Sequence, residues 1–308
     1  MTYSIVARDP DTEELGVAVQ SHYFCTGSAV TWAEAGVGAV ATQSIVDVGY
    51  GPRGLDAMRS GASADIALKE LVSADAMAAV RQVGMVDASG TVATHTGAGC
   101  VAHAGHRAGD GVTVQANMML RSTVPDAMLD AYTTTSGDLA VRLLAALDAA
   151  EAEGGDIRGR QSAAMLIVAG QRSDTPWDAR VIDVRVDDHE QPLAELRRLV
   201  DFNKAFALVA QVFYGGVLFA PVTDPHAPEI EEALQHLEQA QAVLQGNPEP
   251  TFWQAVILGK AGRLEEARTK LGTASAVNAN WPEFLLRLPA VGVIAEDSPL
   301  LAELRSGN

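Results

Sequence analysis

Residues 3–20, YSIVARDPDTEELGVAVQ, have the pattern of two β-strands joined by a turn. Residues 3–9 are rich in side chains that favour strands, and residues 15–20 are apolar almost throughout. Between them, residues 10–14 combine proline, aspartate and threonine, which favour turns. The sequence therefore predicts a β-hairpin at the N-terminus.

Strand and helix patterns continue over the first 220 residues, in separate blocks. Further strands are expected at residues 37–44, 83–87, 91–95, 112–116, 163–169 and 181–186. Helices are expected at residues 50–72, 127–132, 139–150 and 193–213. This grouping favours layered α+β packing over a regular alternation of strands and helices.

A small all-α domain is predicted at the C-terminus. Three prolines between residues 221 and 228 separate a domain of residues 1–220 from one of residues 228–308. Part of a single tetratricopeptide-like repeat is matched by Trp253, Gly262, Ala267, Leu271 and Ala274. Because such repeats usually stand alone only in groups of at least about three, we expect this domain to pack on the first domain or on a partner, and we predict a homo-oligomer.

Composition argues against several functional classes. With 22 Lys and Arg against 39 Asp and Glu, the formal charge of −17 would repel nucleic acid. No apolar run approaches the roughly 20 residues of a membrane-spanning helix, and the first residues lack a secretory signal, so we expect a soluble cytoplasmic protein without a membrane partner. The two cysteines, Cys25 and Cys100, are too few for a disulfide framework.

Neither a metal nor a cofactor is expected. His95, His103, His106 and Cys100 are close in sequence, but their spacing does not place the side chains on one face, so we favour a single histidine, His95, as a proton shuttle. The glycines of residues 97–99 lack the complete phosphate-loop or dinucleotide pattern.

Several short segments together carry a resemblance to a known family. They are YSIVARD (3–9), GVAVQS (16–21), WAEAGVGAVATQ (32–43), YGPRG (50–54), RQVG (81–84), HTG (95–97), AGH (104–106), QANM (115–118) and GRQSA (159–163). On these segments the chain resembles a bacterial family described as a domain of unknown function and placed among the N-terminal-nucleophile (Ntn) hydrolases. The resemblance implies a four-layer αββα sandwich over residues 1–220, whose nucleophile is the first residue of a strand at the mature N-terminus.

Thr2 matches the nucleophile's position. A hydroxyl is a weak nucleophile on its own, and the free α-amine of the same residue, with a pKa near 8, can act as its base. Thr2 is small enough for an aminopeptidase to remove Met1 before it. We therefore expect an amidohydrolase that cleaves an amide bond of a small or peptide-like substrate.

Nine further residues are expected to bind substrate. They are Gln20, Ser21, Glu34, Thr42, Gln43, Arg53, Arg160, Gln161 and Ser162. The strand that ends in Gln20 and Ser21 resembles the second strand of the proteasome-type hairpin, although an acidic residue is usual there; Glu34 is the nearest acidic candidate. No lysine precedes Lys69.

Two side chains have specific expected roles. Asn117, at the polar end of a strand, is the first choice as donor to the developing oxyanion, or else simply ends the strand. The planar fork of Arg160 suits a substrate carboxylate, or else forms a structural ion pair.

Two other functions remain open. The first is a non-catalytic binding or scaffold protein that docks partners through its helical tail. The second is a hydrolase with Cys25 as nucleophile and His95 as base, which is less favoured because residues 23–26 offer no charge to stabilise a thiolate.

Overall fold

The computed structural model describes residues 2–306. The chain divides into two compact units, the first ending at Val200 and the second beginning at Asp201. Within the described residues, no helix is long and apolar enough to cross a membrane.

The first unit contains a six-stranded antiparallel sheet, called sheet A, in the order β10-β9-β2-β1-β8-β7. Its strands are β1 (Thr2–Arg8), β2 (Leu15–Ser21), β7 (Gly105–Gly109), β8 (Val112–Asn117), β9 (Ser162–Val168) and β10 (Arg180–Val186). The predicted N-terminal hairpin is β1 with β2, and it lies at the centre of this sheet. Both strands are buried almost throughout, which explains why their sequences are apolar on both faces.

A second antiparallel sheet, called sheet B, has the order β3-β4-β5-β6 and packs face to face with sheet A. Its strands are β3 (Thr31–Glu34), β4 (Gly38–Ser44), β5 (Arg81–Asp87) and β6 (Val92–Thr96). Successive side chains of a strand point to opposite faces. Thus Val6, Val17 and Val19 pack between the sheets, whereas Tyr3 and Ile5 pack against helices.

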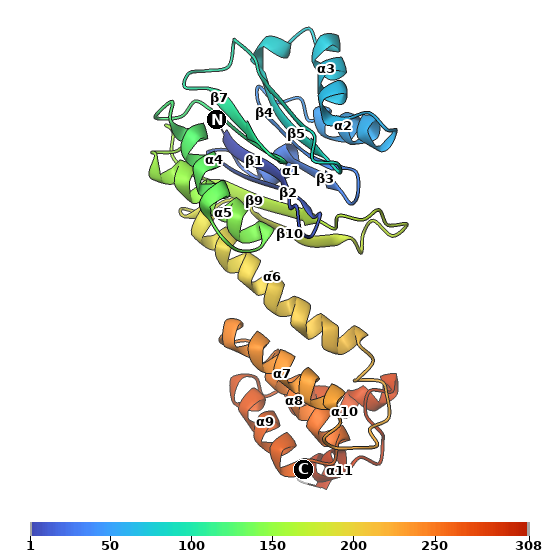
Figure 1. Ribbon diagram of the computed structural model, residues 1–308. Coiled ribbons are helices and arrows are strands. Elements are labelled where there is room, and N and C mark those ends of the chain that lie inside the picture. The colour runs from blue at the N-terminus through green and yellow to red at the C-terminus, as the bar shows by residue number, and fades with distance from the viewer. Residues whose placement is uncertain (1, 307–308) are drawn as a thin grey trace. The chain divides into compact units, whose positions relative to one another are not determined.

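Helices cover the outer face of each sheet (Figure 1). On sheet A lie α4 (Val124–Thr134) and α5 (Leu139–Ala152), and on sheet B lie α2 (Tyr50–Arg59) and α3 (Ala64–Ala74). Short helical segments, α1 (Gly27–Val30) and η1 (Ala78–Val80), lie between strands in the sequence. The first unit is therefore a mixed α and β unit with antiparallel sheets, as expected.

The boundary between the units falls inside one helix, α6 (Pro192–Tyr214), and not in the proline-rich segment at residues 221–228. Leu196 and Val200 belong to the core of the first unit, whereas Val209 and Val212 belong to the core of the second. The helix continues through the boundary because its sequence contains no glycine, and its proline lies at its first position. The three prolines instead lie in the segment that follows this helix, and the last of them, Pro228, begins the next helix.

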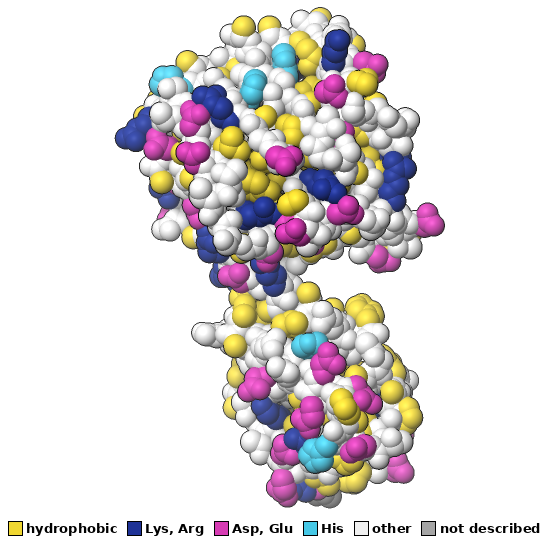
Figure 2. Space-filling model, in the orientation of Figure 1, with side chains coloured by type: hydrophobic (Ala, Val, Ile, Leu, Met, Phe, Trp, Pro, Cys, Tyr) yellow, Lys and Arg dark blue, Asp and Glu magenta, His cyan; other side chains and the backbone are white. Residues whose placement is uncertain are grey.

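The second unit is helical, as expected, and its surface carries side chains of both charges (Figure 2). It contains α7 (Pro228–Val243), α8 (Glu249–Lys260), α9 (Leu264–Val277), α10 (Trp281–Arg287), η2 (Leu288–Val291) and α11 (Pro299–Ser306). Its core includes the stacked rings of Phe252 and Trp281, whose centroids are 4.5 Å apart.

Two strands were missing from the sequence prediction, β3 and β7. Both lie at sheet edges, where one side of the strand has no neighbour. The residues of β3 are all half-buried, and those of β7 are exposed or half-buried. Their sequences consequently lack the apolar alternation by which a strand is recognised.

Candidate functional site

A row of four polar side chains crosses sheet A at the ends of β8, β1, β2 and β9. In the strand register Thr2 lies opposite Asn117 on one side and Ser21 on the other, and Ser21 lies opposite Ser162. Directly opposite residues share a face of the sheet, which here is the face toward sheet B. All four are buried, and Thr2 Oγ1 lies 3.0 Å from Ser21 Oγ.

The backbone of Thr2 is held by side-chain amides from both sheets. Its carbonyl oxygen accepts hydrogen bonds from Gln43 Nε2 at 3.2 Å and from Asn117 Nδ2 at 3.4 Å. The same two amide groups donate to Gln82 Oε1, at 2.8 Å and 2.9 Å. Gln82 in turn donates from Nε2 to the carbonyl oxygen of Ala116 at 2.9 Å.

A second branch of this network lies one step deeper. Gln115 Nε2 donates to Ser4 Oγ at 2.7 Å, and Ser4 Oγ donates to Gln43 Oε1 at 2.7 Å. None of these three side chains is more than 1% exposed. Because buried amides are costly unless paired, the network favours one alignment of the two sheets around Thr2.

Asn117, the expected oxyanion donor, lies beside Thr2. Its Nδ2 is engaged by Gln82 and the Thr2 carbonyl, while its Oδ1 is buried and has no hydrogen-bond partner among the described residues. The position agrees with the expected role, but the donor at present points to the protein's own carbonyl.

A buried carboxylate, Asp156, lies in line with β1 just beyond Thr2. Residues 155–157 pair with residues 118–120 through Ile157 N to Met118 O at 3.3 Å and Leu120 N to Gly155 O at 3.0 Å. Residues 118–120 directly follow β8. Up to Thr2, the neighbour of β8 on this side is β1, and beyond Thr2 residues 155–157 occupy the equivalent position.

The carboxylate of Asp156 is fully buried and turned toward the end of β2. Its Oδ2 accepts a hydrogen bond from His22 N at 3.1 Å, and Arg158 pairs with it at 3.2 Å. His22 directly follows Ser21, the residue opposite Thr2. Sequence reasoning missed Asp156 because it lies in a glycine-rich turn, distant in sequence from β1 and β2.

The histidine connected to this site is His106 and not His95. His95 lies opposite Val83, on the face of sheet B that packs against the helices, and its Nε2 lies 2.8 Å from the carbonyl oxygen of Ala78. His106 Nδ1 lies 2.8 Å from Thr96 Oγ1, and Gln82 Nε2 donates to that same hydroxyl at 3.0 Å. Burial lowers the pKa of His106, which favours the neutral ring.

Gln20 lies on the opposite face of sheet A from the Thr2 hydroxyl. It pairs in register with Tyr3, whose ring packs in the core formed with α4 and α5. Its amide is fully buried, and neither Nε2 nor Oε1 has a partner among the described residues. Alternation along β2 therefore brings Ser21, but not Gln20, to the Thr2 hydroxyl.

Three other expected binding residues have structural partners elsewhere. Glu34 lies opposite Gly38, at the end of β4 remote from Gln43, and forms an ion pair with Arg59. Thr42 faces the helices on sheet B and donates to the carbonyl oxygen of Asp47 at 3.0 Å, and Arg53 pairs with the same aspartate at 2.6 Å. These three do not join the row at Thr2.

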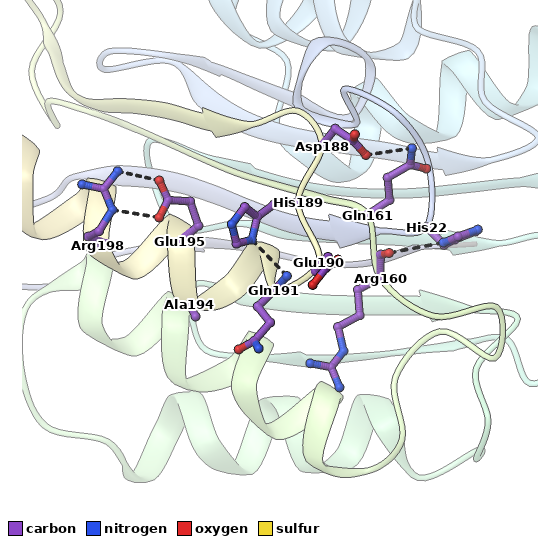
Figure 3. Close-up of a pocket in the computed structure, with 10 residues that line it drawn as sticks. All are labelled: His22, Arg160, Gln161, Asp188, His189, Glu190, Gln191, Ala194, Glu195 and Arg198. Atoms are coloured by element: carbon purple, nitrogen blue, oxygen red, sulfur yellow. Dashed lines mark hydrogen bonds and ion pairs between the residues drawn. The ribbon is translucent and has the colours of Figure 1, made fainter.

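The segment before β9 lines a cavity of about 730 Å³. Figure 3 shows Arg160 and Gln161 extending from this segment in opposite directions. Gln161 Nε2 donates to Asp188 Oδ1 at 3.2 Å, and Arg160 pairs with Glu151 at 2.8 Å. The cavity is lined by His22, Arg160, Gln161, Asp188, His189, Glu190, Gln191, Ala194, Glu195 and Arg198. Of the charged lining residues, Arg160 and Asp188 thus already have partners, and Glu195 pairs with Arg198 at 2.5 Å.

Ser162 does not face this cavity. Its Oγ donates to the carbonyl oxygen of Tyr23 at 2.5 Å and accepts from Thr26 N at 3.1 Å, so it fixes the chain that follows β2. Cys25 lies in that same turn, with a φ of 56°. The cysteine is therefore on the sheet A side, whereas His95 faces the helices on sheet B.

The other metal candidates are dispersed. Cys100 Sγ donates to the carbonyl oxygen of Arg81 at 3.3 Å. Across residues 2–306, no three His, Cys, Asp or Glu side chains are grouped so that they could hold a metal ion.

Comparisons with known proteins identify the family. The chain is similar to protein SPO2555 from Silicibacter pomeroyi, a DUF1028 protein whose crystal structure superposes with a TM-score of 0.59 at 30% sequence identity. The superposition covers 66% of this chain and 88% of that one. Among curated proteins, none matches this sequence significantly. The sequence model of the family of unknown function DUF1028 matches residues 2–196, and the chain belongs to this family.

Proposed function

We propose that the first unit is an N-terminal-nucleophile sandwich and that Thr2 is the nucleophile of an amidohydrolase. The observation that carries the proposal is the position of Thr2. It is the first residue of the central strand β1, its hydroxyl lies 3.0 Å from Ser21 Oγ, and amides from both sheets hold its carbonyl. Such fixed geometry is what a nucleophile needs in order to attack at low entropic cost.

The mechanism requires a free α-amine on Thr2. Met1, whose removal would supply that amine, lies outside the described residues. The neutral amine accepts the proton of Oγ1 as Oγ1 attacks the substrate carbonyl, and the resulting ammonium protonates the leaving amine as the C–N bond breaks. Water then attacks the ester, and its hydrolysis restores the Thr2 hydroxyl.

Two side chains assist in this proposal. Asp156, which also pairs with Arg158, lies beyond the amino end of β1, where its negative charge favours the ammonium form. Asn117 Nδ2 stabilises the oxyanion by turning from the Thr2 carbonyl to the substrate oxygen. Arg160 is not part of this proposal; its guanidinium forms an ion pair with Glu151, the structural alternative that the sequence left open.

The test uses protein from which Met1 has been removed, verified by intact mass. A peptide epoxyketone reacts with both the hydroxyl and the amine of an N-terminal threonine. We expect one adduct on Thr2, a similar adduct with Thr2→Ser, and none with Thr2→Ala. The same protein with Met1 retained is the matched control and should remain unmodified, because its Thr2 nitrogen is an amide. A processed protein that stays unmodified would reject the nucleophile and favour a binding or scaffold function.

A further inference from the structure

The loops at the Thr2 end of the first unit expose large apolar side chains. Tyr23 and Phe24 follow β2 and are 59% and 63% exposed, and Ile45 follows β4 and is 50% exposed. The strands before these loops end at Ser21 and Ser44, next to the polar row and to Gln43.

Three more such side chains lie in other loops of the same end. Val101, between β6 and β7, is 51% exposed; Leu120, after β8, is 48% exposed; and Ile157, before β9, is 60% exposed. We call Tyr23, Phe24, Ile45, Val101, Leu120 and Ile157 the apolar rim.

Backbone hydrogen bonds tie the rim to the polar row. Met118, the residue after Asn117, donates to Val101 O at 3.1 Å and accepts from Ile157 N at 3.3 Å. On the other side, Ser162 Oγ donates to Tyr23 O at 2.5 Å. The rim therefore borders the row on both sides of Thr2.

The opposite end of the sheets is different. Its connections are the turns β1–β2, β3–β4, β5–β6, β7–β8 and β9–β10, and within the described residues these turns expose one large apolar side chain, Trp177. Single exposed apolar side chains are ordinary on protein surfaces, but six in the loops of one end of the sheets, against one at the other end, favour a binding surface there.

We propose that the apolar rim binds the hydrocarbon part of the substrate's acyl group, so that the preferred substrates are amides of alkyl or aryl carboxylic acids. This proposal rests on the function proposed for Thr2. The polar row receives the amide, which can pair with its hydroxyl and amide groups, while burial of hydrocarbon on the rim contributes about 25 cal/mol per Å². A charged acyl group would lose hydration on the rim, and the nearby guanidinium groups of Arg121 and Arg158 already pair with Glu153 and Asp156.

The occupant is a substrate, and not a second copy of the chain, because the rim borders a polar centre instead of forming a continuous apolar face. The core of a protein interface is apolar and depleted in charge, whereas a small-molecule site combines apolar walls with a few placed polar groups. Thr2, Ser21 and Asn117 supply such groups here.

The experiment compares two chromogenic amides, octanoyl-4-nitroanilide and succinyl-4-nitroanilide, which differ only in the acyl group. Processed protein should cleave the octanoyl amide with a kcat/KM at least about ten-fold higher. Phe24→Ser and Ile157→Ser should each lower that value by about three- to ten-fold, whereas Trp177→Ser, at the opposite end, leaves it unchanged. Equal rates for the two amides would overturn the proposal while leaving the nucleophile intact.

A binding measurement tests the apolar rim independently of catalysis by Thr2. In the Thr2→Ala variant, octananilide should bind, and Phe24→Ser added to that variant should weaken binding by a similar factor. Binding without any turnover in processed wild-type protein would support the rim and reject the nucleophile. If octananilide does not bind and Phe24→Ser instead converts a dimer to a monomer in light scattering, the rim is a subunit interface and the substrate assignment is wrong.

Discussion

The side-chain amide of Gln115 occupies the space that a β-carbon on Gly84 would fill, at the contact between β8 and β5. Gln115 must keep that position in order to donate to Ser4 Oγ. A side chain larger than that of glycine at position 84 would displace it. Gly84→Ala should lower the free energy of unfolding by about 1–3 kcal/mol, because overpacking in a dense interior shifts its neighbours. The midpoint of urea denaturation measures this.

A matched glycine on the neighbouring sheet provides the control. The β-carbon of Gly105→Ala would meet only Pro125 Cγ at 3.8 Å, an ordinary contact. That variant should unfold at nearly the wild-type midpoint, and equal losses in both variants would show that the Gln115 contact is not the cause.

The side chain of Gln82 connects the two sheets at the site, so its removal should lower the free energy of unfolding. It accepts from Gln43 and Asn117 and donates to the carbonyl oxygen of Ala116. Gln82→Ala should destabilise the protein by roughly 1–3 kcal/mol for each buried partner left without a hydrogen bond. Gln171→Ala removes an exposed glutamine and should change stability by less than about 0.5 kcal/mol. Similar denaturation midpoints for the two variants would contradict the role of the network.

The pKa of His106 predicts a loss of stability in mild acid. Burial, followed by the charges of Arg107 and His95, lowers the pKa of His106 below its usual value of 6.5. As the pH falls through 6.5, the histidine is protonated in the unfolded chain before it is protonated in the folded chain. The free energy of unfolding therefore decreases. Protonation would also give Thr96 Oγ1 a second donor beside Gln82.

The glutamine side chain in His106→Gln cannot bind a proton. The free energy of unfolding of this variant should therefore fall less than that of wild type between about pH 8 and about pH 5.5. The difference between the two denaturation midpoints at each pH isolates the contribution of His106. A difference that stays constant across this range would show that His106 titrates alike in the folded and unfolded chains.

Asp156 should control the basicity of the Thr2 amine in processed protein. Asp156 lies beyond the amino end of β1, and a nearby opposite charge favours an ammonium group, so Asp156→Asn should lower the pKa of the amine. The pH dependence of amine labelling at Thr2, followed by mass spectrometry, gives this pKa directly. Asp156→Glu should restore most of the shift, whereas a purely structural role would leave the pKa unchanged in both variants.

The ladder at the centre of the fold could be predicted from sequence because its strands are buried on both faces. Residues 3–9 are rich in residues that favour strands, residues 15–20 are mostly apolar, and the turn between them carries proline and aspartate, so β1 and β2 were expected within one or two residues. The sequence left Gln20 and Ser21 both open as neighbours of Thr2, and the strand register in the structure selects Ser21. The edge strands β3 and β7 lack that pattern because one side of each has no neighbour in the sheets.

The residues around Thr2 were harder to predict because long-range contacts bring them together. Gln43, Gln82 and Asp156 lie on different strands and turns, and no local pattern links them. The sequence favoured His95, which the structure turns toward the helices on sheet B, because facing direction depends on register and a short sequence does not determine it.

The connections at the two ends of the strands differ in length. Short turns such as residues 9–14 and 88–91 set the register at one end, while the segments that carry the apolar rim are longer connections at the other. Insertions or substitutions in those connections therefore leave the pairing of Thr2 with Ser21 untouched. A change in the rim would therefore alter the proposed acyl specificity without altering the strand pairing that positions Thr2.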